Sequence, residues 1–250
     1  MRDLARQRLV RHAERGHRAY SRCTPHSVTP WVAGPEEPLV LSRTLAEVEA
    51  SLAASSPWFD PDPAKMSAAV ALVLREGPND LEALFIRRAE HDEDPWSGDL
   101  AFPGGRIDPE DVNGRAAAER ETLEELSLDL TGARPIGRIS DVLGHAESIR
   151  VSAYVYAIEG DPELVPNYEI REAFWSPLDH SNDPGRQAMR DFTYRDRTSA
   201  MPTVRLLEDP RAPVLWGITY KFMDDFMGVI GRPIPFMPWE ENDEGASMGG

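Results

Sequence analysis

The stretch Phe102–Leu128, FPGGRIDPEDVNGRAAAERETLEELSL, constrains the fold and chemistry of this chain more than any other segment. It predicts a glycine-rich turn, an acidic loop and then a helix over residues 114–126, whose buried side is supplied in part by Ala116, Ala117, Ala118 and Leu123. Residues three or four apart are neighbours on a helix surface. Glu121 and Glu125 are therefore predicted to share one face, with Glu124 beside them.

Three carboxylates held this close repel one another. A divalent cation relieves the repulsion, because Mg²⁺ takes oxygen ligands and commonly bridges carboxylates to a substrate phosphate. A solvated acidic face is the plainer interpretation of such a cluster. The segment in front of the helix changes this balance in favour of the metal, because it carries a resemblance to a known family.

This segment resembles the Nudix box, written G-x5-E-x7-R-E-U-x-E-E-x-G-U, where U is an aliphatic residue. The glycine of the box corresponds to Gly105. The charged core of the box is intact in this chain, at Arg120, Glu121, Glu124 and Glu125. The resemblance therefore includes the whole Arg-Glu-x-x-Glu-Glu core of the box.

The chain departs from the box at four places. Asp111 stands where the first Glu is expected, and eight residues rather than seven separate it from Arg120. Thr122 stands at the first aliphatic position, and Ser127 replaces the late glycine. One extra loop residue costs little closure entropy, so we expect it to be accommodated. Glycine is the usual residue at a left-handed helix end, so Ser127 bears on how the helix terminates.

The resemblance extends beyond the box to coenzyme A pyrophosphatase-like Nudix proteins. The segments that carry it are LFIRRAEHDEDPWSGDLAFPGGRIDPED before the box, and NYEIREAFWSPL and LWGITYKF after it. Together they span about residues 65–230. The resemblance implies an α/β/α sandwich around a mixed sheet, and hydrolysis of a nucleoside diphosphate linked to another group.

The same resemblance implies the site residues. Mg²⁺, with Mn²⁺ as a possible substitute, would be held by the helix carboxylates at Glu121, Glu124 and Glu125, with the backbone at Gly104 close by. Either Glu121 or Glu169 would act as general base, and the sequence does not separate the two.

Three arginines complete the expected site. Arg120 is predicted to pair with Glu124 one turn further on and to orient the cluster. Arg88 and Arg106 are candidates for gripping the substrate phosphates, although either could be an ordinary surface residue.

Three functions stay open. The first is cleavage of coenzyme A into 3′,5′-ADP and 4′-phosphopantetheine. The second keeps the chemistry but takes ADP-ribose, another nucleotide sugar or a dinucleotide, and is motivated by the acidic residues within 91–94. The third is a non-catalytic Nudix-fold nucleotide-binding module, motivated by Asp111 and Ser127, although no metal-binding Glu is missing.

Composition narrows the partners. A chain of 250 residues has room for one good-sized domain with extensions. The net charge of −16 argues against nucleic acid as a partner, because phosphate backbones would be repelled. Cys23 is alone, which favours a reducing compartment such as the cytoplasm. No run of about 18 apolar residues predicts a membrane span. The oligomeric state stays open between monomer and homodimer.

The chain divides into three predicted parts: an Arg-rich and Pro-rich extension over 1–40, a Nudix domain over 41–238 and an acidic disordered tail over 239–250. Apolar spacing predicts helices over 42–55 and 215–230, and strands over 67–75, 81–88, 135–142, 148–158 and 173–177. Residues 178–212 read as mostly loop, with short strands at 191–194 and 203–207.

Overall fold

The structure is a computed structural model, and it describes residues 44–62, 65–90, 97–144, 149–194 and 197–235. The predicted extension over 1–40, the predicted tail over 239–250 and the acidic residues within 91–94 lie outside the described residues.

A large mixed sheet forms the centre of the molecule. Its eight strands, all within the described ranges, are β1 (Met66–Glu76), β2 (Leu81–Arg88), β3 (Leu100–Ala101), β4 (Gly104–Arg106), β5 (Arg134–Arg138), β6 (Val142–Gly144), β7 (Ile149–Ala157) and β8 (Ile170–Pro177). β1 runs parallel to β7 and antiparallel to β2 and β4. β8 pairs with the far side of β2.

Strand β1 is buried on both faces, which explains its continuous apolar sequence. Leu72 and Leu74 belong to one hydrophobic cluster. Ala69, Ala71 and Val73 belong to a second cluster on the opposite face. Successive side chains of a strand point to opposite faces, so this single strand serves two cores.

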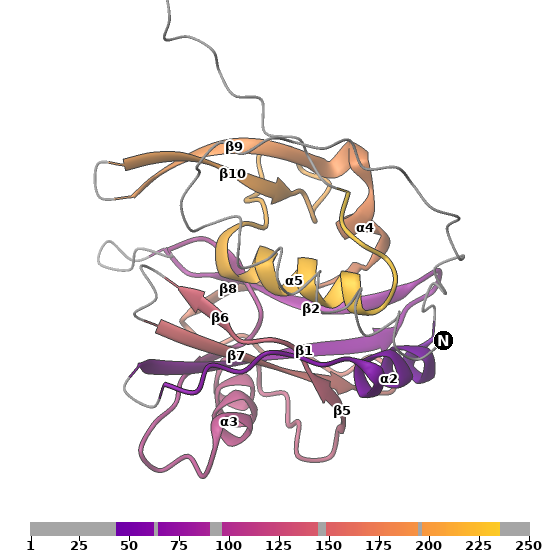
Figure 1. The fold of residues 1–250 in the computed structure, drawn as a ribbon, viewed down its shortest axis with the longest axis vertical. Coiled ribbons are helices and arrows are strands. Elements are labelled where there is room, and N and C mark those ends of the chain that lie inside the picture. Colours follow the sequence, from indigo (N-terminus) through magenta and orange to yellow (C-terminus); the bar gives the residue numbers. More distant parts are fainter. Residues whose placement is uncertain (1–43, 63–64, 91–96, 145–148, 195–196, 236–250) are drawn as a thin grey trace, which may run out of the picture.

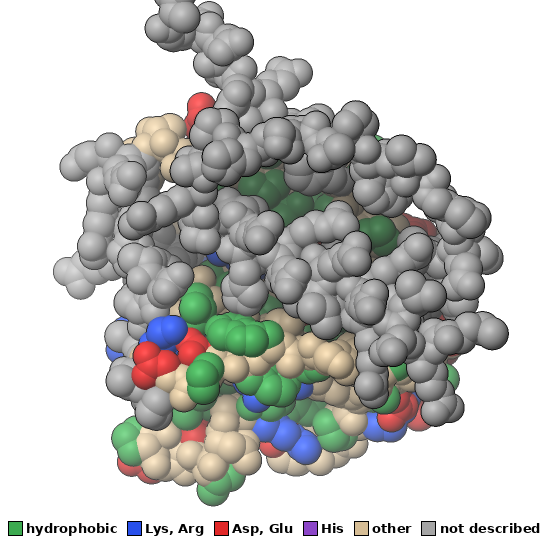
Figure 2. All heavy atoms as spheres, viewed as in Figure 1, with side chains coloured by type: hydrophobic (Ala, Val, Ile, Leu, Met, Phe, Trp, Pro, Cys, Tyr) green, Lys and Arg blue, Asp and Glu red, His purple; other side chains and the backbone are tan. Residues whose placement is uncertain are grey.

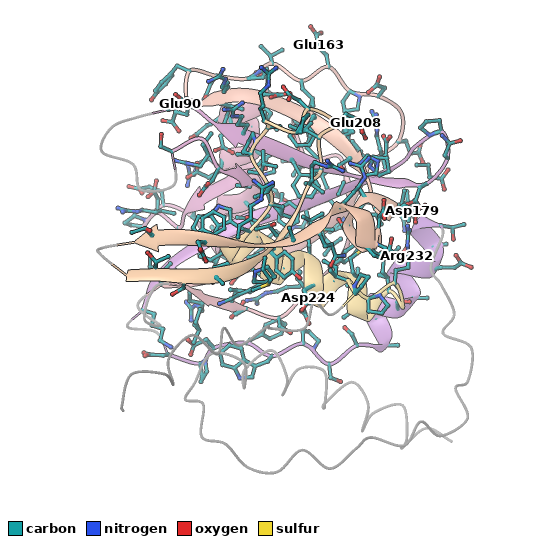
Figure 3. The ribbon with its side chains drawn as sticks, turned by 90° about the horizontal axis from the view of Figure 1, so that it is seen from above. Glu90, Glu163, Asp179, Glu208, Asp224 and Arg232 are labelled. Carbon is teal, nitrogen blue, oxygen red and sulfur yellow. The ribbon has the colours of Figure 1, made fainter. Side chains whose placement is uncertain are left out.

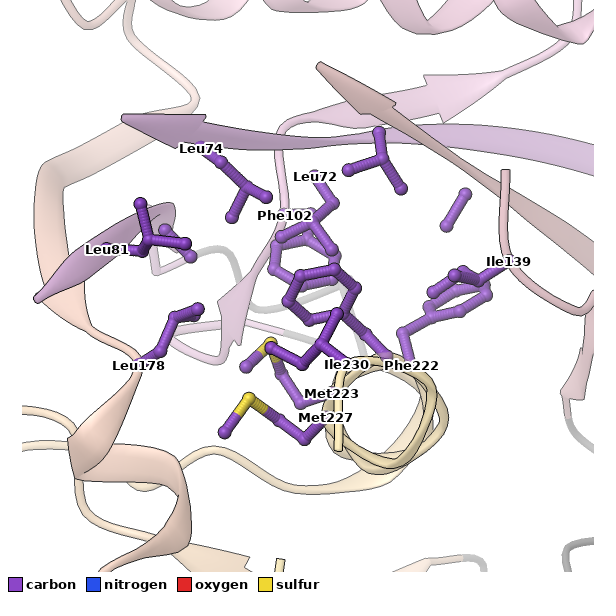
Figure 4. Packing of buried hydrophobic residues seen from close by; sticks show 14 of the residues in the cluster. Leu72, Leu74, Leu81, Phe102, Ile139, Leu178, Phe222, Met223, Met227 and Ile230 are labelled. Atoms are coloured by element: carbon purple, nitrogen blue, oxygen red, sulfur yellow. The ribbon is translucent and has the colours of Figure 1, made fainter. Parts of the chain in front are cut away.

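Helices cover both faces of the sheet. Figure 1 shows α3 (Gly114–Leu126) on one side and α5 (Gly217–Val229) on the other, with α2 (Leu45–Ala54) beside the sheet edge. In Figure 4, Met223, Met227 and Ile230 face Leu72 and Leu74 across the first core. The mixed sheet between helical layers confirms the expected α/β/α architecture.

The two flanking helices lie where the apolar spacing predicts them. Thr44 caps α2 through a capping box with Glu47, so the Thr44 hydroxyl accepts from the Glu47 N–H and the Glu47 carboxylate from the Thr44 N–H. α5 ends just before Gly231, whose φ of 76° lies in the left-handed region that favours glycine.

Two predicted segments differ from the structure. The predicted strand over 135–142 is divided between β5 and the start of β6. Residues 178–212 are not mostly loop, because they contain α4 (Asp179–Asn182), η1 (Pro184–Arg186) and the two-stranded sheet of β9 (Gln187–Tyr194) and β10 (Arg197–Val204). The hairpin lies beyond α5 in Figure 1. Pro202 weakens the strand pattern in the sequence, yet a two-stranded ribbon tolerates it.

Charged side chains on the surface are mixed rather than separated by sign. On the face in Figure 2, basic and acidic side chains of the described residues lie among apolar ones. Exposed ion pairs such as Arg134–Glu49 and Arg171–Glu90 join side chains of opposite charge. None of the helices in the described ranges has both the length and the apolar character needed to cross a membrane.

A buried arginine joins the end of α5 to the rest of the domain. The Arg232 side chain is 2% exposed and donates to both carboxylate oxygens of Asp80, whose side chain is 4% exposed. It also donates to Asp179, which lies beside it in Figure 3. Burial raises the pKa of Asp80, but the Arg232 hydrogen bonds and charge outweigh burial and hold this pKa below its usual value.

We expect Asp80→Asn to lower the free energy of unfolding at pH 7 by about 3–5 kcal/mol, because it removes the buried partner of Arg232 and leaves only the exposed Asp179 carboxylate beside this buried charge. The Asp80 contribution is full above its unfolded pKa of about 4 and is lost as pH falls through the lower folded pKa. Urea unfolding should therefore show the two proteins converging below about pH 4.

The matched control is Asp209→Asn, which removes an exposed ion pair with Arg211. We expect a much smaller loss of stability at pH 7 than for Asp80→Asn, because both side chains of this pair are exposed to solvent. An Asp80→Asn protein as stable as wild type at pH 7 would contradict the assigned role of this pair.

Candidate active site

Helix α3 has a distinct cap at each end. The Asn113 side chain accepts from the Ala116 N–H at 3.0 Å, which satisfies one free donor of the first turn. Ser127 ends the helix in the left-handed conformation with φ 55°, and its N–H donates to the Leu123 carbonyl. The serine therefore adopts the conformation of the glycine that it replaces, at the cost of backbone strain.

The buried face of α3 combines small residues with Leu126 at the end of the helix. Ala117 and Ala118 are fully buried and belong to the same cluster as Ala69 and Ala71 of β1. The sequence also predicts Leu123 on this face, and that is wrong, because Leu123 is 48% exposed. Its place is taken by Thr122, which is fully buried and donates its hydroxyl to the Ala118 carbonyl at 2.7 Å.

Glu125 is the most deeply buried carboxylate of the helix. It is 2% exposed, and its Oε2 accepts from the Gly104 N–H at 2.9 Å. Burial, together with the charges of Glu121 and Glu169, raises the pKa of Glu125 to about 8, against the opposing effects of the Gly104 hydrogen bond and the Arg88 charge. A cation bound here would therefore displace a proton.

Two glycines make this approach possible. Gly104 has φ 145°, and a Cβ on it would lie 2.3 Å from the Ala69 carbonyl oxygen. A Cβ on Gly105 would instead lie 2.5 Å from the Glu121 carboxylate. Gly104 is thus required because the backbone of β1 leaves no room for a side chain, and Gly105 leaves space beside the Glu121 carboxylate.

Arg120 forms hydrogen bonds with the other two candidate metal ligands of the helix. Its Nη1 donates to Glu121 at 3.0 Å and to Glu124 at 3.3 Å, as the sequence predicts for Glu124. Burial raises the pKa of Glu121, with the charge of Glu124 adding to this effect and Arg120 opposing it. The three candidate metal ligands on α3 thus do not share one partner, since Glu125 accepts from the Gly104 N–H instead.

Asp111 is the acid that pairs with Arg120 through two hydrogen bonds rather than one. Its two carboxylate oxygens accept from Nε at 3.1 Å and from Nη2 at 3.0 Å, a bidentate arrangement. The hydrogen bonds from Arg120 lower the pKa of Asp111. The sequence marks Asp111 only as a departure from the box, so this partner of Arg120 was missed.

The loop before β8 brings a fourth acid to the site. The charge of Glu169 acts on Glu125, and the Glu169 carbonyl accepts from the Ala89 N–H at 2.7 Å. The hydroxyl of Tyr168, which is 81% exposed, hydrogen-bonds the Glu169 carboxylate, and this contact raises the pKa of Tyr168.

The two candidate phosphate-binding arginines differ. Arg88 lies at the end of β2, and its charge acts on Glu125, so the structure brings it to the carboxylates. Arg106 is exposed, and its carbonyl accepts from Arg120 Nη2 at 3.1 Å. The backbone of Arg106 thus supports the site, while its side chain points to the surface.

The donor chemistry of the site fits a divalent cation. Within the described ranges, no three His, Cys, Asp or Glu side chains are close enough together to hold a metal as they stand. Instead, Glu121 and Glu124 accept from Arg120, and Glu125 accepts from Gly104. All are hard oxygen donors, and the space beside Glu121 at Gly105 is free of side chain.

A known family of proteins matches the part of the chain that forms this site. The family model described as the NUDIX domain matches residues 64–195, more than half of the chain. The chain belongs to the NUDIX family. The matched range includes α3, the Gly104-Gly105 pair and Glu169, and so the whole of the candidate site.

Three curated relatives have low sequence identity to the chain. An uncharacterized protein of Schizosaccharomyces pombe is 34% identical over 38% of this chain and 31% of its own length. A probable nudix hydrolase of the same yeast is 25% identical over 54% and 46%. The peroxisomal coenzyme A diphosphatase NUDT7 of Mus musculus is 28% identical over 55% and 57%. The chain thus spans only 31% to 57% of the length of these relatives.

Among solved structures, a MutT/nudix family protein from Enterococcus faecalis is similar over 75% of this chain and 68% of that one. Its identity is 15% and its TM-score 0.45. The Nudix hydrolase RenU of M. smegmatis covers 49% and 74%, with 21% identity and a TM-score of 0.40.

We expect Gly105→Ala to leave the free energy of unfolding within about 1 kcal/mol of wild type, because only the flexible end of Glu121 must move. The displaced carboxylate should weaken Mg²⁺ binding about tenfold in titration calorimetry. Gly104→Ala is the contrasting variant, since its Cβ meets backbone and should unfold the domain more readily. Equal destabilisation by both changes would contradict this distinction.

Ser127→Gly should stabilise the domain by about 0.5–1 kcal/mol, because glycine adopts the left-handed conformation without strain. Ser55→Gly at the end of α2 is the control. Ser55 has an ordinary φ of −74°, and its hydroxyl donates to the Leu52 carbonyl, so this change should destabilise. Thermal unfolding of both variants measures the difference, and the same sign of change in both would be inconsistent with this account.

Proposed function

We propose that this protein is a divalent-cation-dependent hydrolase that cleaves the diphosphate bond of a nucleotide joined to a second group, with coenzyme A as the first candidate substrate. The observation that carries the proposal is the burial of Glu125 against the Gly104 N–H, within the influence of Glu121 and Glu169. Burying a carboxylate among other carboxylates is costly unless a cation compensates it.

Mg²⁺, or Mn²⁺ in its place, would be held by Glu121, Glu124 and Glu125. When bound, such a cation neutralises phosphate charge and makes a water more acidic. Gly105 keeps the space beside Glu121 clear. Arg120, fixed by Asp111, keeps Glu121 and Glu124 on the same side of the helix.

Hydrolysis needs a base that accepts a proton from the attacking water as the bridging P–O bond breaks. Glu121 and Glu169 are the two candidates. The Arg120 guanidinium stabilises the charged form of Glu121, whereas Glu169 is held by the Tyr168 hydroxyl. Arg88, whose charge already acts on Glu125, would bind a phosphate oxygen, with Arg106 as a second candidate at the surface.

The choice of coenzyme A rests on the Phe102–Gly105 leader and on the likeness to a mouse coenzyme A diphosphatase. ADP-ribose, another nucleotide sugar or a dinucleotide would use the same carboxylates. A non-catalytic binding module is disfavoured because Glu121, Glu124 and Glu125 are all present. Cytoplasmic location and a monomer or homodimer stay predictions from the sequence.

The test is hydrolysis of coenzyme A, ADP-ribose and a dinucleoside polyphosphate, side by side, with Mg²⁺ and with chelator. We expect 3′,5′-ADP and 4′-phosphopantetheine from coenzyme A, and no product with chelator. Glu125→Gln should lower kcat at least about a hundredfold, since loss of even a supporting residue at a metal site costs up to that much.

The fold should survive Glu125→Gln, because glutamine has nearly the same shape as glutamate and brings no charge to this buried position. Glu163→Gln, an exposed acid at the periphery in Figure 3, is the control and should keep full activity. Preference for ADP-ribose or the dinucleoside polyphosphate would change the assigned substrate and keep the hydrolase function. No Mg²⁺-dependent turnover of any of the three compounds would refute the proposal for these substrates.

A further inference from the structure

The C-terminal end of α3 is closed by a distant segment. The last carbonyls of a helix have no partner within it and need donors from elsewhere. Here the Asn167 N–H donates to the Glu125 carbonyl at 2.8 Å, and the Val165 N–H donates to the Leu126 carbonyl at 2.8 Å. The loop before β8 is therefore built onto the end of the helix that carries the carboxylates.

The Asn167 side chain contributes in two directions at once. Its Nδ2 donates to the Glu124 carbonyl at 3.1 Å, and its Oδ1 accepts from the Glu169 N–H at 2.8 Å. Asparagine carries a donor and an acceptor on one short side chain, which aspartate and serine cannot offer in the same way. One side chain thus connects the helix end to the backbone of Glu169.

We propose that Asn167 is a positioning residue that fixes Glu169 relative to the carboxylates of α3. The proposal rests on the proposed hydrolase function, because it assigns Glu169 a part in the reaction. Asn167 touches neither substrate nor metal in this account. It acts only through the placement of Glu169.

The second anchor of Glu169 is the end of β2. Its carbonyl accepts from the Ala89 N–H at 2.7 Å, next to the register shift between Arg87 and Arg88 where β2 pairs with β8. Such irregularities re-aim side chains beside functional sites. The Glu169 backbone is therefore held by Asn167 on its N–H side and by β2 on its carbonyl side.

Removal of the Asn167 side chain would take away the first anchor and keep the second. The backbone hydrogen bonds of Asn167 and Val165 to α3 would remain, so the domain should still fold. Glu169 would then be free to turn about its remaining anchor. A displacement of about 1 Å at a reacting group can cost about a hundredfold in rate.

The experiment measures kcat and KM for the preferred substrate in wild type, Asn167→Ala, Glu169→Gln and the double variant, at saturating Mg²⁺. We expect Asn167→Ala to lower kcat about tenfold to a hundredfold, with KM changed less than about threefold. If Asn167 acts through Glu169, the double variant should match Glu169→Gln within about twofold.

Asn113→Ala is the matched control. It removes another asparagine hydrogen bond from α3, at the opposite end, and should cost a similar amount of stability. Since Asn113 has no contact with Glu169, we expect its kcat to stay within about twofold of wild type. Equal kcat losses in Asn113→Ala and Asn167→Ala would mean that helix stability alone is responsible, and would overturn the proposal.

Asn167→Asp provides a second test. It keeps an oxygen acceptor facing the Glu169 N–H, but it loses the amide donor to the Glu124 carbonyl and adds a negative charge there. Its kcat should exceed that of Asn167→Ala at least about threefold, and a kcat no higher would count against the proposal.

Different results would refute the hydrolase function and the positioning role of Asn167. No turnover by wild type would remove the proposed hydrolase function. An active wild type in which Asn167→Ala, or Glu169→Gln, keeps its full kcat would remove only the positioning role. Additive losses in the double variant would also overturn that role, because they would show Asn167 acting independently of Glu169.

Discussion

The close approach of α3 to strand β1 decides where the charges of the site lie. Alanines on both elements take part in this contact, Ala117 and Ala118 from the helix and Ala69 and Ala71 from the strand. Glu125, on the buried side of the same helix, is therefore carried inward until its carboxylate meets the Gly104 N–H. A single backbone donor does not offset the desolvation of a carboxylate, and this leaves an unfavourable electrostatic energy that a cation relieves.

The same constraint explains the two adjacent glycines. Gly104 and Gly105 belong to β4, which pairs with Val70 and Ala69 of β1 directly beside the helix. Any side chain at Gly104 would collide with β1, and any side chain at Gly105 would displace Glu121. The glycine pair is thus a packing requirement first, and its chemical use follows from the space that it leaves.

Much of this could be predicted from sequence, where the signal is local. The helix over 114–126 and the strand over 81–88 agree with their predicted bounds, because caps, turns and apolar runs lie within each segment. The β9–β10 hairpin was underestimated, since Pro202 and alternating polar residues resemble loop. Leu123 was placed on the wrong face, because apolar character alone does not reveal that a threonine can be buried once its hydroxyl is paired.

The site could be predicted only in part for the same reason. The acids of α3 are recognisable by their spacing, whereas Asn167 owes its importance to contacts with residues 43 positions away. No local pattern encodes a hydrogen bond between a loop and the end of a distant helix. Tyr168 likewise has meaning only once its hydroxyl is seen beside Glu169.

Asp111 shows how a departure from the box can keep its geometry. Aspartate is one methylene shorter than glutamate, and the loop before Arg120 is one residue longer, so the two changes can offset each other. The result is a bidentate pair, with the Arg106 carbonyl as a further acceptor. These contacts hold the guanidinium without Glu121 or Glu124. Both acids would therefore be able to turn toward a cation while Arg120 stays in place, which would separate the residue proposed to orient the site from the residues proposed to bind metal.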